Sequence, residues 1–159
     1  MSERPREQST LDAIYDVSIR SNENVVERIN ALDQKFKGLL TLSSAIAVMA
    51  TFLARDGFLK PYDCWLILVL VIFGLIVLIS AYAMISLRKV AVVSPKELLD
   101  RDSYLGISEY KKTVAGYYGW CFEINNETVI KKWRWFQLIW YLTLAQIGLV
   151  VVGSILSLP

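Results

Sequence analysis

The chain has 159 residues and a formal net charge of only +2, which is too small to indicate nucleic acid as the main partner. Hydrophobic residues make up 55% of it and the mean hydropathy is +0.42, both high for a soluble protein. It has no histidine, which excludes the commonest general base and metal ligand. The apolar residues are concentrated in three blocks, which indicates membrane spans rather than a globular core.

A helix is predicted from Leu11 to Ala54, because that stretch contains no proline and a single glycine, Gly38. Residues alternately four and three positions apart form a seam of the kind that packs one helix against another. The seam consists of Leu11, Tyr15, Ser18, Asn22, Val25, Ile29, Leu32, Phe36, Leu39 and Ser43. Charged residues occupy the other faces as far as Lys37 and are then absent up to Ala54. We therefore expect one helix that starts at Thr10 in water, ends in a membrane and bends at Gly38.

Two polar residues, Ser18 and Asn22, interrupt the seam in the predicted cytoplasmic helix, residues 1–37. Two interpretations are open: such residues fix the register or oligomeric state of paired helices, or the seam is loosely packed and partly wet there. The first predicted span, residues 38–54, continues the line as a stripe of small side chains: Ser43, Ala47, Ala50 and Ala54. Small side chains let helices approach closely in lipid, so we expect this span to lie inside a helix bundle.

A short external loop is predicted at residues 55–64, followed by a second span at residues 65–87. This span has no charge and is rich in Leu, Ile and Val on every side, which is typical of a helix that faces lipid. The largest polar segment, residues 88–135, contains predicted helix starts at Ser94 and Ser108. Its second helix carries another seam, made of Tyr110, Val114, Tyr117, Cys121 and Ile124. The segment closes with the basic and aromatic residues Lys131, Lys132, Trp133, Arg134 and Trp135, which are typical of a membrane boundary.

The third span is predicted at residues 136–157, with one face made of Ile139, Thr143, Gln146, Val150, Gly153 and Ser157. Gln146 lies near the middle of this span, where an amide should not face lipid. Two interpretations are open. Gln146 and Thr143 contact another helix, or they line a polar path together with the small stripe of the first span. Because three spans cannot enclose a sizeable channel, such a path requires several chains.

Basic residues are distributed unevenly between the predicted spans. Residues 1–37 contain six lysines and arginines and residues 88–135 contain nine, whereas the first loop contains only Arg55 and Lys60. Basic segments favour the cytoplasmic side, so we expect an inner-membrane protein with a cytoplasmic N terminus and an external C terminus. The predicted fold is all-α, with three transmembrane helices and two cytoplasmic helical extensions that continue into the first and third spans.

The sequence carries no motif of an enzyme. It has no glycine-rich phosphate loop, no metal-ligand spacing and no serine elbow, so we expect no catalytic residue, metal or cofactor. Cys64 and Cys121 fall on opposite sides in the predicted topology. A disulfide between them is not expected, and we interpret both as packing residues.

Aromatic and basic residues gather in the second cytoplasmic segment: Tyr110, Lys111, Lys112, Tyr117, Tyr118 and Trp120. Aromatic faces beside ammonium groups can stack a base and neutralise a phosphate, which suits a small nucleotide ligand. The alternative is that the aromatic residues pack against residues 11–37 while the lysines are solvated. The same two segments also echo each other, since Tyr15 precedes Asn22 by seven residues and Tyr118 precedes Asn125 by seven.

The arrangement resembles the small membrane effectors of bacterial anti-phage systems, above all the transmembrane effector of cyclic-pyrimidine (Pycsar) defence, with CBASS-type effectors as broader relatives. The features that carry the resemblance are Asn22–Lys37 running into Gly38-Leu39-Leu40, and Glu109-Tyr110, Tyr117-Tyr118, Asn125 and Lys131-Lys132 before the last span. The resemblance implies an oligomeric sensor that binds a nucleotide signal or a partner in the cytoplasm and disrupts the inner membrane.

Three functions follow as hypotheses. The first is this membrane effector, whose partners are the lipid bilayer, further copies of the chain, and a nucleotide second messenger or a cytoplasmic protein. The second is a non-toxic assembly or scaffold subunit that recruits a cytoplasmic partner through its seam. The third is a subunit of a small oligomeric channel, which requires Gln146 to face water.

Overall fold

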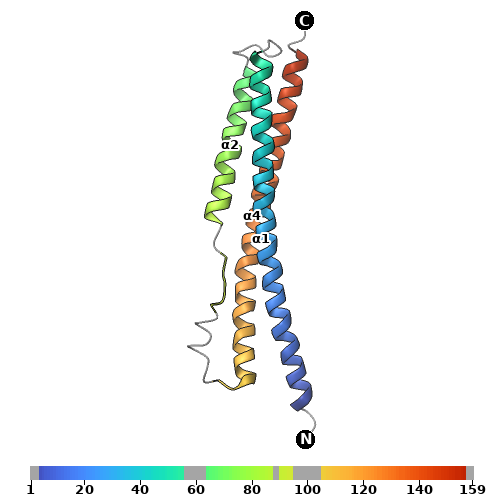
Figure 1. The fold of residues 1–159 in the computed structure, drawn as a ribbon, viewed down its shortest axis with the longest axis vertical. Helices are drawn as coiled ribbons and strands as arrows, with labels where there is room; N and C mark the ends of the chain where they lie inside the picture. Colours follow the sequence, from blue (N-terminus) through green and yellow to red (C-terminus); the bar gives the residue numbers. More distant parts are fainter. Residues whose placement is uncertain (1–3, 56–63, 88–89, 95–104, 157–159) are drawn as a thin grey trace. The chain divides into compact units, whose positions relative to one another are not determined.

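The structure is a computed structural model that describes residues 4–55, 64–87, 90–94 and 105–156. The described residues form three helices and no strand: α1 (Arg4–Arg55), α2 (Cys64–Ser86) and α4 (Ile107–Leu156) (Figure 1). All three helices are long and apolar enough to cross a membrane. The prediction of an all-α chain with three candidate spans is therefore confirmed, as is the continuation of the first and third spans into longer helices.

Helix α1 begins earlier than predicted. It starts at Arg4 rather than at Thr10, and it includes Pro5. Proline is tolerated in the first turn of a helix, because its missing N–H has no partner within the helix there. The helix then passes Gly38 without interruption and ends at Arg55, one residue beyond the predicted end.

Helix α2 matches the predicted second span to within one residue at each end. Helix α4 begins one residue before the predicted start at Ser108, and its first turn is closed by a hydrogen bond from the N–H of Tyr110 to the carbonyl oxygen of Gly106, 2.9 Å long. The helix predicted after Ser94 falls on residues 95–104, which lie outside the described residues. Residues 90–94 are described and are not helical.

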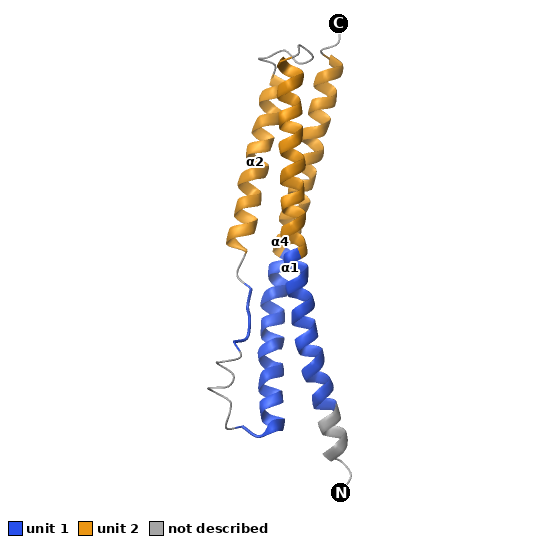
Figure 2. Cartoon of the chain, viewed as in Figure 1, with its two compact units in different colours: residues 1–30, 89–130 blue, residues 31–88, 131–159 orange. Residues whose placement is uncertain are grey.

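The chain divides into two compact units, coloured separately in Figure 2. Unit 1 comprises residues 1–30 and 89–130, so it contains the first part of α1, the first part of α4 and the non-helical residues 90–94. Unit 2 comprises residues 31–88 and 131–159, so it contains α2 and the second parts of α1 and α4. Helices α1 and α4 thus each supply residues to both units.

The predicted seam of α1 is buried from Asn22 onward, whereas Leu11, Tyr15 and Ser18 are half-buried. Its buried side chains are Asn22, Val25, Ile29, Leu32, Phe36, Leu39, Ser43, Ala47, Ala50 and Ala54, all from the seam or its stripe of small residues. The predicted face of the third span is buried as well at Ile139, Thr143, Gln146, Val150 and Gly153. Ser157 lies outside the described residues. The hydrophobic periodicity therefore predicted the contact faces of both membrane segments correctly.

The seam predicted at the start of α4 is buried only in part, since Tyr110 and Tyr117 are half-buried. Val114 and Cys121 are buried, but Ile124 is 36% exposed and its neighbour Asn125 takes the buried place. The difference arises because Asn125 is hydrogen-bonded to Asn22 of α1. Hydrophobic periodicity predicted that Ile124 is buried, but Asn125 is buried instead because it has a polar partner on the facing helix.

Within each unit, α1 and α4 run in the same direction. In unit 1, Asp12 contacts Lys111 and Asn22 contacts Asn125, so positions on the two helices increase together. In unit 2, Asp33 contacts Lys132 and Ser43 contacts Gln146 in the same sense. A pair of parallel helices requires a return segment between them, and α2 provides one in unit 2.

Helix α2 runs opposite to α4 in unit 2. Tyr82, late in α2, contacts Trp135, early in this part of α4, whereas Val69 lies beside Gln146. Only four side chains of α2 are buried, namely Val69, Ile76, Ser80 and Ala83. Large apolar residues are exposed on its other faces, among them Ile67, Val71, Leu75, Leu78 and Ile85. This exposure fits a helix that presents most of its surface to lipid.

Candidate functional site: polar layers between α1 and α4

An ion pair joins the two helices near the start of α4 in unit 1. Lys111 Nζ lies 2.5 Å from Asp12 Oδ1, and the two side chains are 29% and 51% exposed. Exposed pairs of this kind contribute only about 0–1 kcal/mol, because water competes for both charges. Lys111, a candidate for ligand binding, is therefore engaged by α1 through a contact that costs little to break.

A fully buried amide, that of Asn125, joins three segments of unit 1. Its Nδ2 donates to Asn22 Oδ1 and to the carbonyl oxygen of Ala91, both at 2.9 Å. Its Oδ1 accepts from the N–H of Ala91 at 2.8 Å. Both donors of the amide are thus used, and a mispaired register would leave them unsatisfied. The structure supports a register-setting role for Asn22, whereas Ser18 makes a local bond to the carbonyl oxygen of Ile14.

The second ion pair, in unit 2, is far less accessible than the first. The side chain of Lys132 is completely buried and that of Asp33 is 25% exposed, with 2.5 Å between Nζ and Oδ1. Lys132 was predicted to belong to a basic collar at the membrane boundary. The structure shows that this lysine does not face outward, because Asp33 on the facing helix supplies the charge that makes its burial possible.

The polar residues of the predicted first and third spans meet in unit 2. Ser43 Oγ donates to Gln146 Oε1 at 2.7 Å, and Gln146 Nε2 lies 3.3 Å from the carbonyl oxygen of Ser43 and 3.5 Å from that of Val69. Thr143 Oγ1 donates to the carbonyl oxygen of Ile139 within α4. Three helices of one chain thus satisfy the Gln146 amide, which supports the interpretation as a helix contact.

The small residues Ala47, Ala50 and Gly153 are buried in the same unit. Ala50 forms an apolar cluster with Val69 and Val150, so side chains from α1, α2 and α4 meet there. Short side chains permit close approach of the helices, which is the condition for the hydrogen bonds of Gln146. The six residues predicted for membrane packing or a pore all lie in this interior: Ser43, Ala47, Ala50, Thr143, Gln146 and Gly153.

The polar layers of the two units repeat each other. The partners of both ion pairs are 99 residues apart in sequence, and those of both amide layers are 103 apart. The four residues that form the polar layers of unit 1 each have a counterpart in unit 2, 21 residues later in the sequence: Asp12 and Asp33, Asn22 and Ser43, Lys111 and Lys132, Asn125 and Gln146. Twenty-one residues are three heptads, so each layer returns to the same face of its helix.

The separation of 103 residues that both amide layers share explains the sequence echo between the two cytoplasmic segments. Tyr15 and Tyr118 are also 103 residues apart. The pKa of Tyr118 is raised, first by burial and then by the proximity of Tyr15 and Glu23. The echo therefore consists of residues that face each other across parallel helices. The ion pairs were not predicted, although the equal separation of Asp12–Lys111 and Asp33–Lys132 in the sequence was a signal for them.

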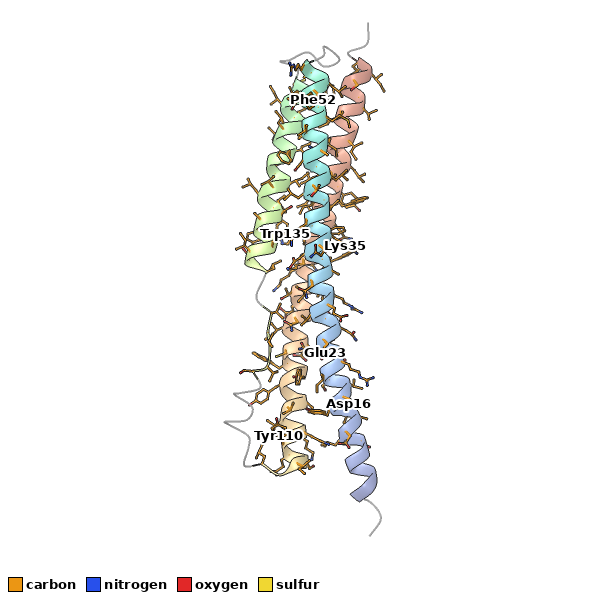
Figure 3. The ribbon with its side chains drawn as sticks, viewed as in Figure 1. Asp16, Glu23, Lys35, Phe52, Tyr110 and Trp135 are labelled. Carbon is orange, nitrogen blue, oxygen red and sulfur yellow. The ribbon has the colours of Figure 1, made fainter. Side chains whose placement is uncertain are left out.

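The structure divides the predicted nucleotide-binding cluster. Tyr118 is half-buried near Tyr15 of α1, whereas Lys112 is exposed. Tyr117 lies on another face of α4, where it lines a shallow depression of about 520 Å³ with Thr113, Gly116 and Trp120. Tyr110 is half-buried in the first turn of α4 and is labelled in Figure 3. A flat ligand in the depression could reach Tyr117 and Trp120 together, but not Tyr118.

The two cysteines differ in their surroundings, and neither forms a disulfide. Cys121 is buried in unit 1, and burial raises the pKa of its thiol. Cys64 is exposed at the start of α2, so its predicted role as a packing residue is wrong. The described residues contain no group of three potential metal ligands.

Comparison of the chain with protein-family models, with curated proteins and with solved structures finds no match.

Replacement of Gln146 by leucine is expected to lower the free energy of unfolding by about 0.5–2 kcal/mol, the range of interhelical hydrogen bonds in membrane proteins and model peptides. Ser43 loses its side-chain acceptor, and the loss is limited because its hydroxyl can turn to a carbonyl within α1. Unfolding in detergent, followed by circular dichroism, measures the change. Gln137→Leu on the exposed face of α4 is the matched control, and an equal loss in both variants would contradict the prediction.

Proposed function

We propose that the chain is an oligomeric membrane effector that permeabilises the bacterial inner membrane when its cytoplasmic part receives a signal, as anti-phage effectors do. The observation that carries the proposal is the course of α1 and α4. Each is a single helix with residues in both units, and each unit holds the two together by polar layers. A signal that alters the pairing in unit 1 therefore acts on the helices that form the candidate spans of unit 2.

The polar layers lower the free-energy cost of a change in the pairing of α1 and α4. Hydrogen-bonded residues at seam positions specify register, but they stabilise a helix pair less than apolar residues do. An amide such as Asn125 can also exchange its partner for the same group of another copy at little cost, because donors and acceptors are matched in both states. Oligomerisation with exchange of the Asn22–Asn125 bond is consistent with this design.

The charge distribution supports the proposed orientation. Fifteen of the seventeen lysines and arginines lie in residues 1–37 and 88–135, which favours a cytoplasmic location for unit 1. The N terminus is then cytoplasmic and the C terminus external. The signal is a cyclic nucleotide or a protein, and the candidate contacts are Tyr110, Lys111, Lys112 and Tyr117 with Trp120 at the depression.

A measurement of membrane potential tests the proposal. Cells that express the chain with a pyrimidine nucleotide cyclase are expected to depolarise before growth stops, whereas cells that express either protein alone keep their potential. A voltage-sensitive dye follows the change. Growth arrest with an unchanged potential would contradict permeabilisation, and depolarisation that does not depend on the cyclase would contradict a nucleotide signal.

A second candidate function is a scaffold subunit that recruits a cytoplasmic protein. It is favoured by the outer face of α4 in unit 1, where Trp120 is 60% exposed beside the shallow depression. Exposed aromatic residues of this kind are common anchors of protein interfaces. This function predicts a stable complex on purification and no growth defect on overexpression, both opposite to the effector.

A further inference from the structure

Residues 90–94, here called the strap, lie against α4 in unit 1 although they are not helical. Val90, Ala91, Val93 and Ser94 are half-buried, whereas Val92 is 72% exposed. The strap therefore presents one side to the helices and Val92 to solvent. Figure 1 shows it as a drawn-out stretch between α2 and α4.

Ala91 of the strap bonds to a side chain of α4 through both of its backbone groups. The N–H and the carbonyl oxygen of Ala91 both bond to the amide of Asn125, at 2.8 and 2.9 Å. This two-point contact resembles the pairing of two strands, with the side-chain amide in place of the second backbone. It requires the backbone groups of Ala91 and does not depend on its side chain.

The amide that holds the strap also holds α1. Nδ2 of Asn125 has two hydrogens, one bonded to Ala91 and the other to Asn22. When the strap leaves, one Nδ2 hydrogen of Asn125 loses its acceptor, the carbonyl oxygen of Ala91. Its Oδ1 loses its donor, the N–H of Ala91. Buried polar groups do not stay unsatisfied, so the amide must admit water or turn away from Asn22. Either response loosens the pairing of α1 with α4 in unit 1.

We propose that the strap is a releasable clamp, and that its detachment from Asn125 opens the contact between α1 and α4 in unit 1. The inference concerns unit 1 alone, and it does not depend on a membrane-permeabilising function. Any partner that draws residues 90–94 away, whatever its chemistry, then loosens the two helices through one amide.

Cys121 reports on this opening. It is four residues before Asn125, so it lies one turn away on the same face of α4, and its exposed fraction is only 2%. A thiol so placed reacts with a maleimide only when the contact opens. The second cysteine, Cys64, is exposed and must be replaced, so the experiment uses the Cys64→Ser chain in lipid nanodiscs.

The first test compares two proline variants in that background. Ala91→Pro removes the N–H that bonds to Asn125, whereas Val92→Pro alters a neighbouring exposed position and removes neither Ala91 group that bonds to Asn125. We expect maleimide labelling of Cys121 to be about tenfold faster in Ala91→Pro, as for a bond worth about 1.4 kcal/mol, and unchanged in Val92→Pro. Equal acceleration in both variants would overturn the proposal, because the amide bond would not be the cause.

A second pair of variants decides the matter if Ala91→Pro does not fold. Val93→Asp places a charge on the half-buried side of the strap, and Val92→Asp places the same charge on its exposed side. Only Val93→Asp is expected to accelerate the labelling of Cys121. Hydrogen exchange at residue 91 shows whether the strap has left, and slow labelling with a released strap would overturn the proposal.

Discussion

Replacement of Phe36 by alanine is expected to lower the free energy of unfolding by about 3–5 kcal/mol, the largest effect of any single change considered for this chain. Phe36 is fully buried in unit 2. Its ring meets that of Phe136 edge to face, with 5.9 Å between centroids and 81° between planes. Phe136 in turn stacks on Trp133. Alanine at position 36 removes one ring of this aromatic group and leaves a cavity that the two remaining rings cannot fill.

Phe52→Ala is the matched control, because Phe52 lies on the same helix and is 57% exposed (Figure 3). Its loss is expected to stay within about 0.5 kcal/mol, as for other exposed positions. Thermal and denaturant unfolding of the two variants in the same detergent, followed by circular dichroism, gives the difference. Similar unfolding free energies for Phe36→Ala and Phe52→Ala would show that the α1–α4 contact at this level is not formed.

Replacement of Lys132 by methionine is expected to cost about 2–4 kcal/mol. Removing one partner of a buried ion pair leaves the other charge uncompensated, which costs most when that charge is also buried. Asp33 is 25% exposed, and water lowers the penalty below the full range for such pairs. The expected result is a lower melting temperature in detergent, with helix content at low temperature unchanged.

Two further variants separate the ion pair from the packing of the lysine. Lys37→Met changes an exposed lysine of the same unit and is expected to have little effect. The double variant Lys132→Met, Asp33→Leu removes both charges, and it is expected to recover most of the lost stability. A double variant as unstable as the sum of its single changes would contradict an interaction between Asp33 and Lys132.

The repeated polar layers explain how α1 and α4 keep one register within each unit. An apolar seam alone tolerates a shift by one heptad, because every seven residues bring similar side chains to the same face. Four polar contacts at separations of 99 and 103 residues do not tolerate it, since a shift unpairs two ion pairs and two amides together. Specificity of pairing is thus obtained at a modest cost in stability.

Much of the fold follows from local patterns. The absence of charge over residues 65–87 predicted α2 nearly to the residue. Alternate spacings of four and three on α1 predicted its buried face from Asn22 to Ala54. These predictions succeeded because helix faces are determined by the period of the backbone, which any single segment reveals.

The candidate site was predicted less completely. Ser43 and Gln146 were both placed on inward faces, but their bond to each other depends on the register between α1 and α4. Lys132 was predicted to belong to a basic and aromatic collar at the membrane boundary, without a partner on another helix. Its burial depends on Asp33, 99 residues away, and no local pattern reports on such a partner.

The sequence by itself determined the buried faces of α1 and of the third span, because amphipathic periodicity is a property of one helix. The sequence also determined that three segments are long and apolar enough to span a membrane. Only the tertiary structure decided which polar residues meet, that α1 and α4 are parallel with equal layer spacings, and that Asn125 holds the strap. The physical reason is that buried polar groups are stabilised by partners from other segments, so their placement is decided by the assembled fold.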